Sequence, residues 1–144
     1  PLILRLPGRI PAGVRVTDGM SSHVDLLPTI LDLAGQRPAE GIQGRSLRPL
    51  WDGGDTAPFQ AVFAELRADI GWKKINPSLG HGILMLRTRD AKLLLPEGGS
   101  PELFDLAADP VESTDISGRD PGRTRELSAR LQAAVERAHA AGNC

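Results

Sequence analysis

The sequence predicts an α/β protein, in which the end of a larger α/β domain is followed by a small α+β subdomain with an antiparallel sheet and a C-terminal helix. Three observations lead to this prediction. An apolar run opens the chain, short apolar runs separated by turn residues occupy residues 61–104, and a segment with helical periodicity follows residue 120. A Gly-Gly-Asp sequence at 53–55 marks the seam, so we expect two parts, residues 1–52 and residues 53–144.

The first predicted element is a strand at residues 2–6. Its nearly continuous aliphatic sequence is typical of a strand buried on both faces of an α/β sheet, and Pro7 and Gly8 end it. The chain opens directly on this run and without a Met. We therefore expect it to be a piece of a longer protein.

A helix is predicted after Asp25. Aliphatic side chains recur there at the spacing of one helical face, which we expect to pack inward: Leu27, Ile30, Leu31 and Ala34. With Asp25 as the N-cap, Pro28 falls in the first turn, where its missing N–H removes no intrahelical hydrogen bond. Gly35 then ends the helix in the C′ position.

A small antiparallel meander is predicted from four short apolar runs, at residues 61–64, 83–86, 93–95 and 103–104. Turn residues at 89–90 and 97–100 separate the later runs. The last element is a helix capped by Asp120 with Pro121 in its first position. Its apolar face is expected to consist of Leu127, Leu131, Ala134, Val135 and Ala138, and Gly142 is expected to end it.

Composition excludes several function classes. Seventeen basic and eighteen acidic residues give a net charge of -1, so the sequence offers no basic field for nucleic acid. Its apolar stretches fall far short of the roughly 18 to 20 residues that a membrane span needs, so we expect none. Cys144 is the one cysteine, which excludes an internal disulfide and a cysteine metal site.

One segment has the composition of a ligand-contacting loop. Residues 71–81 lie between two predicted strands and bring together an indole, two ammonium groups and an imidazole, from Trp72, Lys73, Lys74 and His81. Long polar and aromatic loops on a rigid sheet often contact ligands, so we take these four as candidate substrate-binding residues. The alternative is an ordinary hairpin loop with Trp72 packed on the core. No nucleophile–base arrangement and no metal-ligand spacing is found.

Five segments, in order, resemble the C-terminal region of the sulfatases, in the alkaline phosphatase superfamily. They are residues 1–13, 22–35, 41–50, 85–94 and 102–115, of which the last reads ELFDLAADPVESTD. The resemblance implies that residues 1–52 end an alkaline-phosphatase-like catalytic domain and that residues 53–144 form the small subdomain beside it. The partners that it implies are a missing N-terminal catalytic portion and, as substrate, a sulfated small molecule or glycan.

The resemblance also implies a chemistry that this segment does not carry. Sulfatases hydrolyse sulfate esters with a formylglycine, made within a Cys-x-Pro-x-Arg motif, and with a divalent cation, usually Ca²⁺. Here Cys144 is terminal, and the Gly80-His81-Gly82 sequence lacks the Asp of the family's Asp-His-Gly metal motif. We therefore expect no catalytic and no metal-binding residue in the segment, and no activity from it alone.

Two alternatives remain open at this point. The chain could belong to a phosphodiesterase or phosphonate hydrolase of the same superfamily, because the nucleophile that would decide lies upstream. It could also be a stand-alone, non-catalytic interaction module. A sharply monomeric and cooperatively melting 144-residue product would favour the module.

Overall fold

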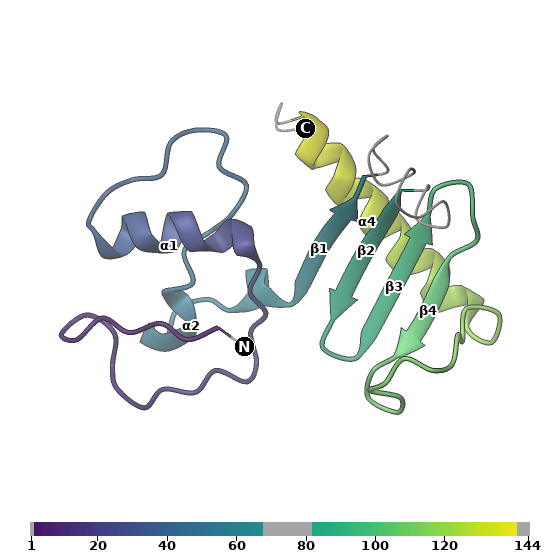
Figure 1. Ribbon diagram of the computed structural model, residues 1–144, viewed down its shortest axis with the longest axis horizontal. Coiled ribbons are helices and arrows are strands. Elements are labelled where there is room, and N and C mark those ends of the chain that lie inside the picture. Colours follow the sequence, from purple (N-terminus) through teal and green to yellow (C-terminus); the bar gives the residue numbers. More distant parts are fainter. Residues whose placement is uncertain (1, 68–81, 141–144) are drawn as a thin grey trace, which may run out of the picture. The chain divides into compact units, whose positions relative to one another are not determined.

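The computed structural model describes residues 2–67 and 82–140. The chain divides into two compact units, of which the first ends at Val62 and the second runs from Phe63 to Ala140. Figure 1 shows α1 and α2 in the first unit, and most of a four-stranded sheet with α4 in the second. The predicted division into domains at residues 1–52 and 53–144 stays a prediction, because the two compact units are defined only by contacts within this chain.

The first unit contains four helical segments joined by long loops. They are the 3₁₀ turns η1 (His23–Asp25) and η2 (Ala57–Phe59) and the helices α1 (Leu26–Leu33) and α2 (Pro49–Asp52). The predicted C-terminal end of α1 is confirmed, since Gly35 has a φ of +72°. Asp25 holds the N-cap position of α1, but its carboxylate makes no capping hydrogen bond to the helix and instead accepts one from the N–H of Ser22, because η1 precedes α1 directly. The N–H of Gly35 donates to the carbonyl of Asp32, and the N–H of Gln36 donates to the carbonyl of Leu31, which together form a Schellman motif.

The predicted strand at residues 2–6 is wrong for this chain. These residues form no strand in the structure, and the Ile3 side chain is 86% exposed. A doubly buried strand needs hydrogen-bonding neighbours on both sides, and the only sheet in the described residues consists of β1 to β4. The aliphatic run therefore lies along the surface of the first unit.

The predicted inward face of α1 is also wrong. Leu27 and Ile30 are 53% and 61% exposed, whereas Thr29, on the opposite side of the helix, is 1% exposed. The polar side faces inward because the segment at residues 44–47 packs on it through hydrogen bonds. Among the described residues of the first unit, the aliphatic side of α1 has no apolar layer to pack against.

The second unit contains the predicted meander, which is confirmed. Its strands are β1 (Ala61–Leu66), β2 (Ile83–Thr88), β3 (Ala91–Pro96) and β4 (Glu102–Asp105), and they lie in the order β1-β2-β3-β4. β2 pairs antiparallel with β3, and β3 pairs antiparallel with β4. The arrows of Figure 1 alternate in direction across the whole sheet.

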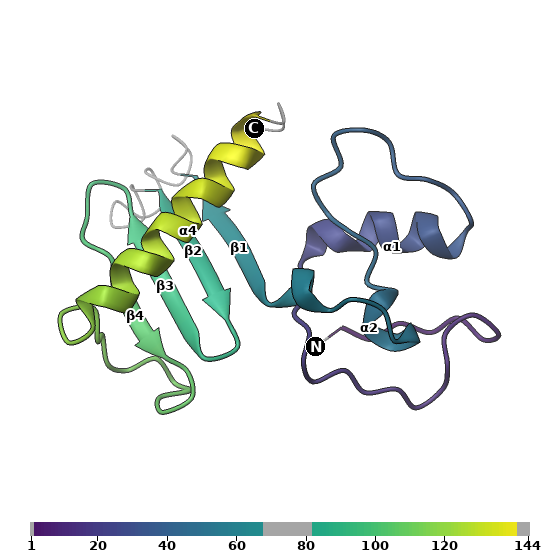
Figure 2. The same cartoon turned by 180° about the vertical axis from the view of Figure 1, so that it is seen from behind.

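The core of this unit lies between the sheet and α4 (Pro121–Ala140). Leu93 is opposite Leu86 on β2 and Leu103 on β4, and all three are buried together with Leu127 and Leu131 of α4. Figure 2 shows α4 running diagonally across this face of the sheet. The predicted cap is confirmed, since the Asp120 carboxylate accepts a hydrogen bond of 2.9 Å from the N–H of Arg123. Neither α4 nor any other helix in the described ranges is long and apolar enough to cross a membrane.

Candidate functional site

The four predicted substrate-binding residues, Trp72, Lys73, Lys74 and His81, lie outside the residues that the structure describes. Their positions in the sequence are between the end of β1 at Leu66 and the start of β2 at Ile83. Their role as a binding loop therefore stays a prediction.

A cavity of about 590 Å³ lies in the second unit, lined in part by the residues that flank this segment, Arg67 and Gly82. Apolar side chains from the sheet and from α4 line it, including Leu84, Leu95 and Val135. Its polar lining comes from Glu65, Arg67, Glu97 and His139. The volume is in the range of small-molecule sites, and the lining combines apolar surface with a few polar groups, as such sites do.

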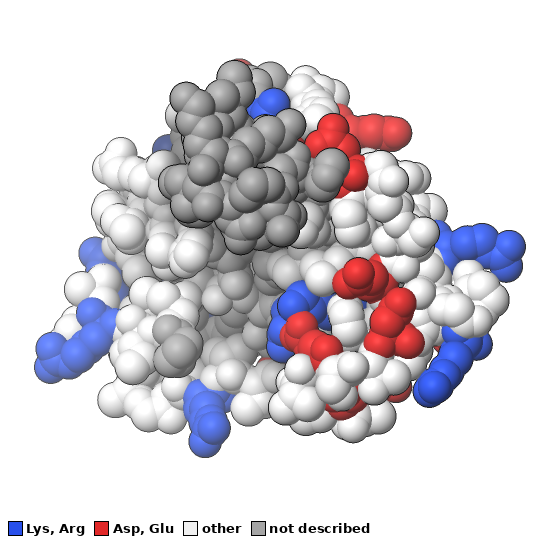
Figure 3. Space-filling view, turned by 45° about the vertical axis from the view of Figure 1, so that its right-hand side comes forward, with Lys and Arg blue, Asp and Glu red and all other residues white. Residues whose placement is uncertain are grey.

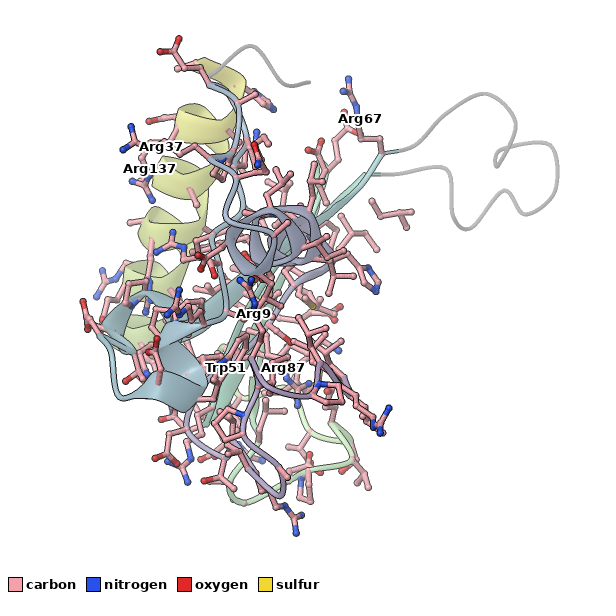
Figure 4. The ribbon with its side chains drawn as sticks, turned by 90° about the vertical axis from the view of Figure 1, so that its left-hand side faces the viewer. Arg9, Arg37, Trp51, Arg67, Arg87 and Arg137 are labelled. Atoms are coloured by element: carbon pink, nitrogen blue, oxygen red, sulfur yellow. The ribbon has the colours of Figure 1, made fainter. Side chains whose placement is uncertain are left out.

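The polar groups of the cavity differ in how firmly they are held. Glu97 and Gly82 are joined twice: the N–H of Glu97 donates to the carbonyl of Gly82, and the N–H of Gly82 donates to the Glu97 carboxylate. Arg67 is held only loosely, since its Nε lies 3.9 Å from the Glu65 carboxylate and its side chain is 69% exposed. Figure 4 shows Arg67 projecting from the end of β1. Its guanidinium remains accessible to an anionic group.

Five carboxylates lie at the end of β4 and in the loop that joins β4 to α4, which we call the acidic loop, and backbone hydrogen bonds occupy those of Asp105, Asp109 and Asp115. Asp109 accepts from the N–H groups of Ser113 and Thr114, and Asp105 accepts from the N–H of Ala107. Asp115 accepts from the N–H groups of Leu103 and Ser117, and these hydrogen bonds lower its pKa below the ordinary value for aspartate. These carboxylates therefore serve to fix the loop.

The part of the chain that the structure describes forms no metal site. Throughout residues 2–67 and 82–140, no group of three or more His, Cys, Asp or Glu side chains is placed to hold a metal ion. The described donors therefore do not fit the divalent cation that the resemblance implies.

Sequence reasoning did not single out a charged cluster made by Arg87, Lys92 and Glu112. The Glu112 carboxylate forms an ion pair with the Nζ of Lys92 and a second, of 3.4 Å, with the Arg87 guanidinium. Arg87 and Lys92 are opposite one another on β2 and β3. Figure 3 shows Lys and Arg side chains beside Asp and Glu side chains on the face that it presents. A signal existed in the sequence, namely a lysine that interrupts the apolar run of β3.

The cluster joins the acidic loop to the sheet. Glu112 has a φ of +58°, a left-handed conformation that is uncommon for residues with a side chain. Two cations on adjacent strands repel one another, and one carboxylate between them removes this repulsion. The loop is thereby pinned on the sheet face opposite to α4, because Lys92 alternates with the buried Ala91 and Leu93 along β3.

Comparison with known proteins gives consistent results. Residues 1–141 match the family described as N-sulphoglucosamine sulphohydrolase, C-terminal. Human arylsulfatase K is 32% identical over 139 residues, which covers 94% of this chain and 25% of that protein. A solved structure of a protein in complex with its substrate D-glucosamine-2-N,6-O-disulfate is 27% identical with a TM-score of 0.69, and the match covers 95% of this chain and 28% of that one.

A second similar solved structure is that of an enzyme with a different activity. The phosphonate monoester hydrolase from Silicibacter pomeroyi is 28% identical with a TM-score of 0.63, and the match covers 78% of this chain and 24% of that one. In each of these comparisons the chain spans roughly a quarter of the other protein's length.

Proposed function

Because the chain belongs to the C-terminal family of the sulfatases that is described as N-sulphoglucosamine sulphohydrolase, we propose that it is the C-terminal portion of an enzyme that hydrolyses sulfuric esters. The observation that carries this proposal is the match over residues 1–141, which includes both units of the structure. The antiparallel sheet with its C-terminal helix is the fold that sulfatases share in this region, as the TM-score of 0.69 indicates.

The role of this chain in that enzyme is structural and positional. The described residues form no metal site, and the carboxylates of the acidic loop are committed to hydrogen bonds and to the Glu112 cluster. A formylglycine and a divalent cation would supply the nucleophile and stabilise the charge that develops on the sulfate oxygens. Both would be held by a portion of the enzyme outside this chain, so the chain alone is inactive.

The substrate that fits these relatives is a sulfated saccharide. The family description names N-sulphoglucosamine, and one similar structure holds a glucosamine disulfate. Residues Trp72, Lys73, Lys74 and His81 would contact such a substrate, with the ammonium groups attracting sulfate and the indole stacking on a sugar ring. Supporting this role, their segment is flanked by Arg67 and Gly82, which line the cavity of the second unit.

A comparison of substrates on the full-length protein tests the proposal. Turnover of an aryl sulfate and of glucosamine-2-N,6-O-disulfate is expected to exceed turnover of a phosphonate monoester. The reverse order would move the protein to the phosphonate hydrolase alternative. Separately, the 144-residue chain with added Ca²⁺ is expected to show no sulfate hydrolysis. Hydrolysis by the isolated chain that survives Cys144→Ala would contradict the assignment of the reactive centre to another portion.

A further inference from the structure

We propose that Asp115 and Ile116 form an edge guard, which closes the outer side of β4 and prevents a second copy of the protein from adding a strand to the sheet there. β4 is the last strand in the order β1-β2-β3-β4, and Figure 1 shows it at the border of the sheet. A strand in this position offers N–H and C=O groups to the strands of other molecules unless it is covered. This role is independent of the enzyme activity proposed above.

The edge guard binds the backbone of Leu103, in the middle of β4. The N–H of Leu103 donates to the Asp115 carboxylate at 2.9 Å, and the carbonyl of Leu103 accepts from the N–H of Ile116 at 2.8 Å. In an antiparallel sheet, one residue of an added strand would exchange the same two hydrogen bonds with Leu103. The edge guard therefore takes the place of a fifth strand at this position, with a side-chain oxygen as the acceptor.

The outward positions on either side of Leu103 are blocked as well. Backbone hydrogen-bonding groups alternate in direction along an antiparallel strand, so residues 101 and 105 face the same way as Leu103. Pro101 has no N–H that could donate to another strand. The carbonyl of Asp105 accepts from the N–H of Asp109 at 2.8 Å. The acidic loop thus folds back along β4, and the edge guard closes its centre.

The Asp115 carboxylate is held in place by the residue two positions further along the chain. Its Oδ1 atom accepts from the N–H of Ser117 at 2.8 Å as well as from Leu103, and its Oδ2 atom accepts from the Ser117 hydroxyl at 2.9 Å. An ionised carboxylate accepts hydrogen bonds and donates none, so it offers no N–H to an approaching strand. A charged group at a sheet edge also opposes the pairing of strands from different molecules.

The segment that carries the edge guard is fixed on both flanks by contacts that do not involve the Asp115 side chain. Upstream, the Glu112 carboxylate pairs with two cations of the sheet. Downstream, the N–H groups of Arg119 and Asp120 both donate to the carbonyl of Ile116, at 2.9 Å each. Removing the Asp115 carboxylate is therefore expected to open the outer side of β4 while the sheet and α4 stay folded.

Hydrogen exchange of the full-length protein, read residue by residue, tests whether the carboxylate closes the edge. Asp115→Ala removes the acceptor of the Leu103 N–H. Asp115→Asn is the matched control, because it removes the same charge and keeps an oxygen that can accept. The Leu103 amide is expected to exchange at least about tenfold faster in Asp115→Ala than in the unaltered protein, and to change less than about threefold in Asp115→Asn. An unchanged rate in Asp115→Ala, or an equal loss of protection in Asp115→Asn, would overturn the proposal.

The unaltered protein provides a second test, which does not depend on the folding of any variant. Relative to their intrinsic rates, the Leu103 amide is expected to exchange at least about tenfold more slowly than the amide of Gly118, an exposed residue of the acidic loop. Equal protection of the two amides would show that the outer side of β4 is open, and would overturn the proposal.

Self-association tests what the edge guard excludes. Over an about hundredfold rise in concentration, Asp115→Ala is expected to form larger species in sedimentation velocity, whereas Asp115→Asn keeps the distribution of the unaltered protein. In these larger species the Leu103 amide is expected to regain about tenfold protection, because the strand of a second copy binds its N–H. Association that leaves the Leu103 amide unprotected, or an open edge that never associates, would overturn the proposal.

Discussion

The hydroxyl oxygen of Thr29 lies 3.0 Å from the backbone nitrogen of Leu47, eighteen residues further along the chain, and both residues are almost fully buried. This hydrogen bond joins α1 to the loop that precedes α2. The same hydroxyl donates to the carbonyl of Asp25 one turn earlier, at 2.6 Å. The Thr29 hydroxyl thus gives a hydrogen-bond acceptor to the buried N–H of Leu47, which lies in a loop and has no helix or strand partner.

The first prediction concerns this hydroxyl. Thr29→Val keeps the shape of the side chain but leaves the N–H of Leu47 buried without an acceptor, which costs about 1–3 kcal/mol of the free energy of unfolding. Urea denaturation of the full-length protein measures it. Thr17→Val is the control, because Thr17 is exposed and its hydroxyl bonds only to the neighbouring Asp18, so its effect should stay within about 0.5 kcal/mol. Equal effects of the two variants would contradict the role of Thr29.

The second prediction uses two glycines with opposite surroundings. Gly44→Ala places a Cβ 1.8 Å from the backbone oxygen of Val24, so the loop must move away from α1, at a cost of about 1–3 kcal/mol or more. Gly118→Ala meets nothing within 4 Å and serves as the matched control. Thermal unfolding of both variants is the measurement. A Gly44→Ala protein as stable as the control would show that residue 44 and α1 are not in the described contact.

The third prediction separates the members of the charged cluster. Glu112→Gln leaves Arg87 and Lys92 facing one another on adjacent strands without a carboxylate, whereas Lys92→Met leaves Glu112 paired with Arg87. Glu112→Gln should therefore be the more destabilising change, by about 1 kcal/mol. The side chains of Glu112 and Lys92 are only 25% and 19% exposed, so solvent screens this ion pair incompletely. Denaturation of both single variants and the double variant checks this order, and a more harmful Lys92→Met would refute it.

The fourth prediction follows from the pKa of Asp115. The N–H groups of Leu103 and Ser117 bind the ionised carboxylate, which lowers its pKa in the folded state below the value in the unfolded chain. As the pH falls, Asp115 is therefore protonated in the unfolded chain before it is protonated in the folded protein. The stabilisation is complete above the pKa of Asp115 in the unfolded chain, and it is lost as the pH falls through the pKa in the folded protein. Acid titration of the free energy of unfolding should be less steep below about pH 4 in Asp115→Asn than in the unaltered protein. Parallel curves would contradict this prediction.

Local signals in the sequence account for the elements that were predicted correctly. The caps at Gly35 and Asp120 depend on residues within one helical turn, and both were found in the structure, whereas Asp25 holds the N-cap position of α1 without a capping hydrogen bond. The meander was found because alternating apolar runs and turn residues specify strands and their reversals. The register also follows from this pattern, since it brings Leu86, Leu93 and Leu103 to one face.

What sequence reasoning missed depends on contacts between distant residues. The aliphatic spacing of α1 was correct, but the inward side was decided by Thr29 and Asp25 binding a loop about twenty residues away. The strand predicted at residues 2–6 needs neighbours that the described sheet does not supply. The cluster at Glu112 depends on a left-handed residue at a position where the sequence has no glycine. The candidate binding loop lies outside the described residues, so the sequence remains its only evidence.

The last prediction concerns that loop in the full-length enzyme. Replacing Lys73, Lys74 and His81 together by alanine removes two ammonium groups and an imidazole from the segment, and each charge-assisted contact to a sulfate is worth about 1.5–3 kcal/mol. KM for glucosamine-2-N,6-O-disulfate should rise by about tenfold or more, with a smaller effect on kcat, because these residues would bind the substrate without touching the reacting sulfur. Arg125→Ala, an exposed cation on α4, is the control and should leave both constants unchanged. Unaltered kinetics in the triple variant would remove this loop from the substrate site, while the assignment of the chain to the sulfatases would stand.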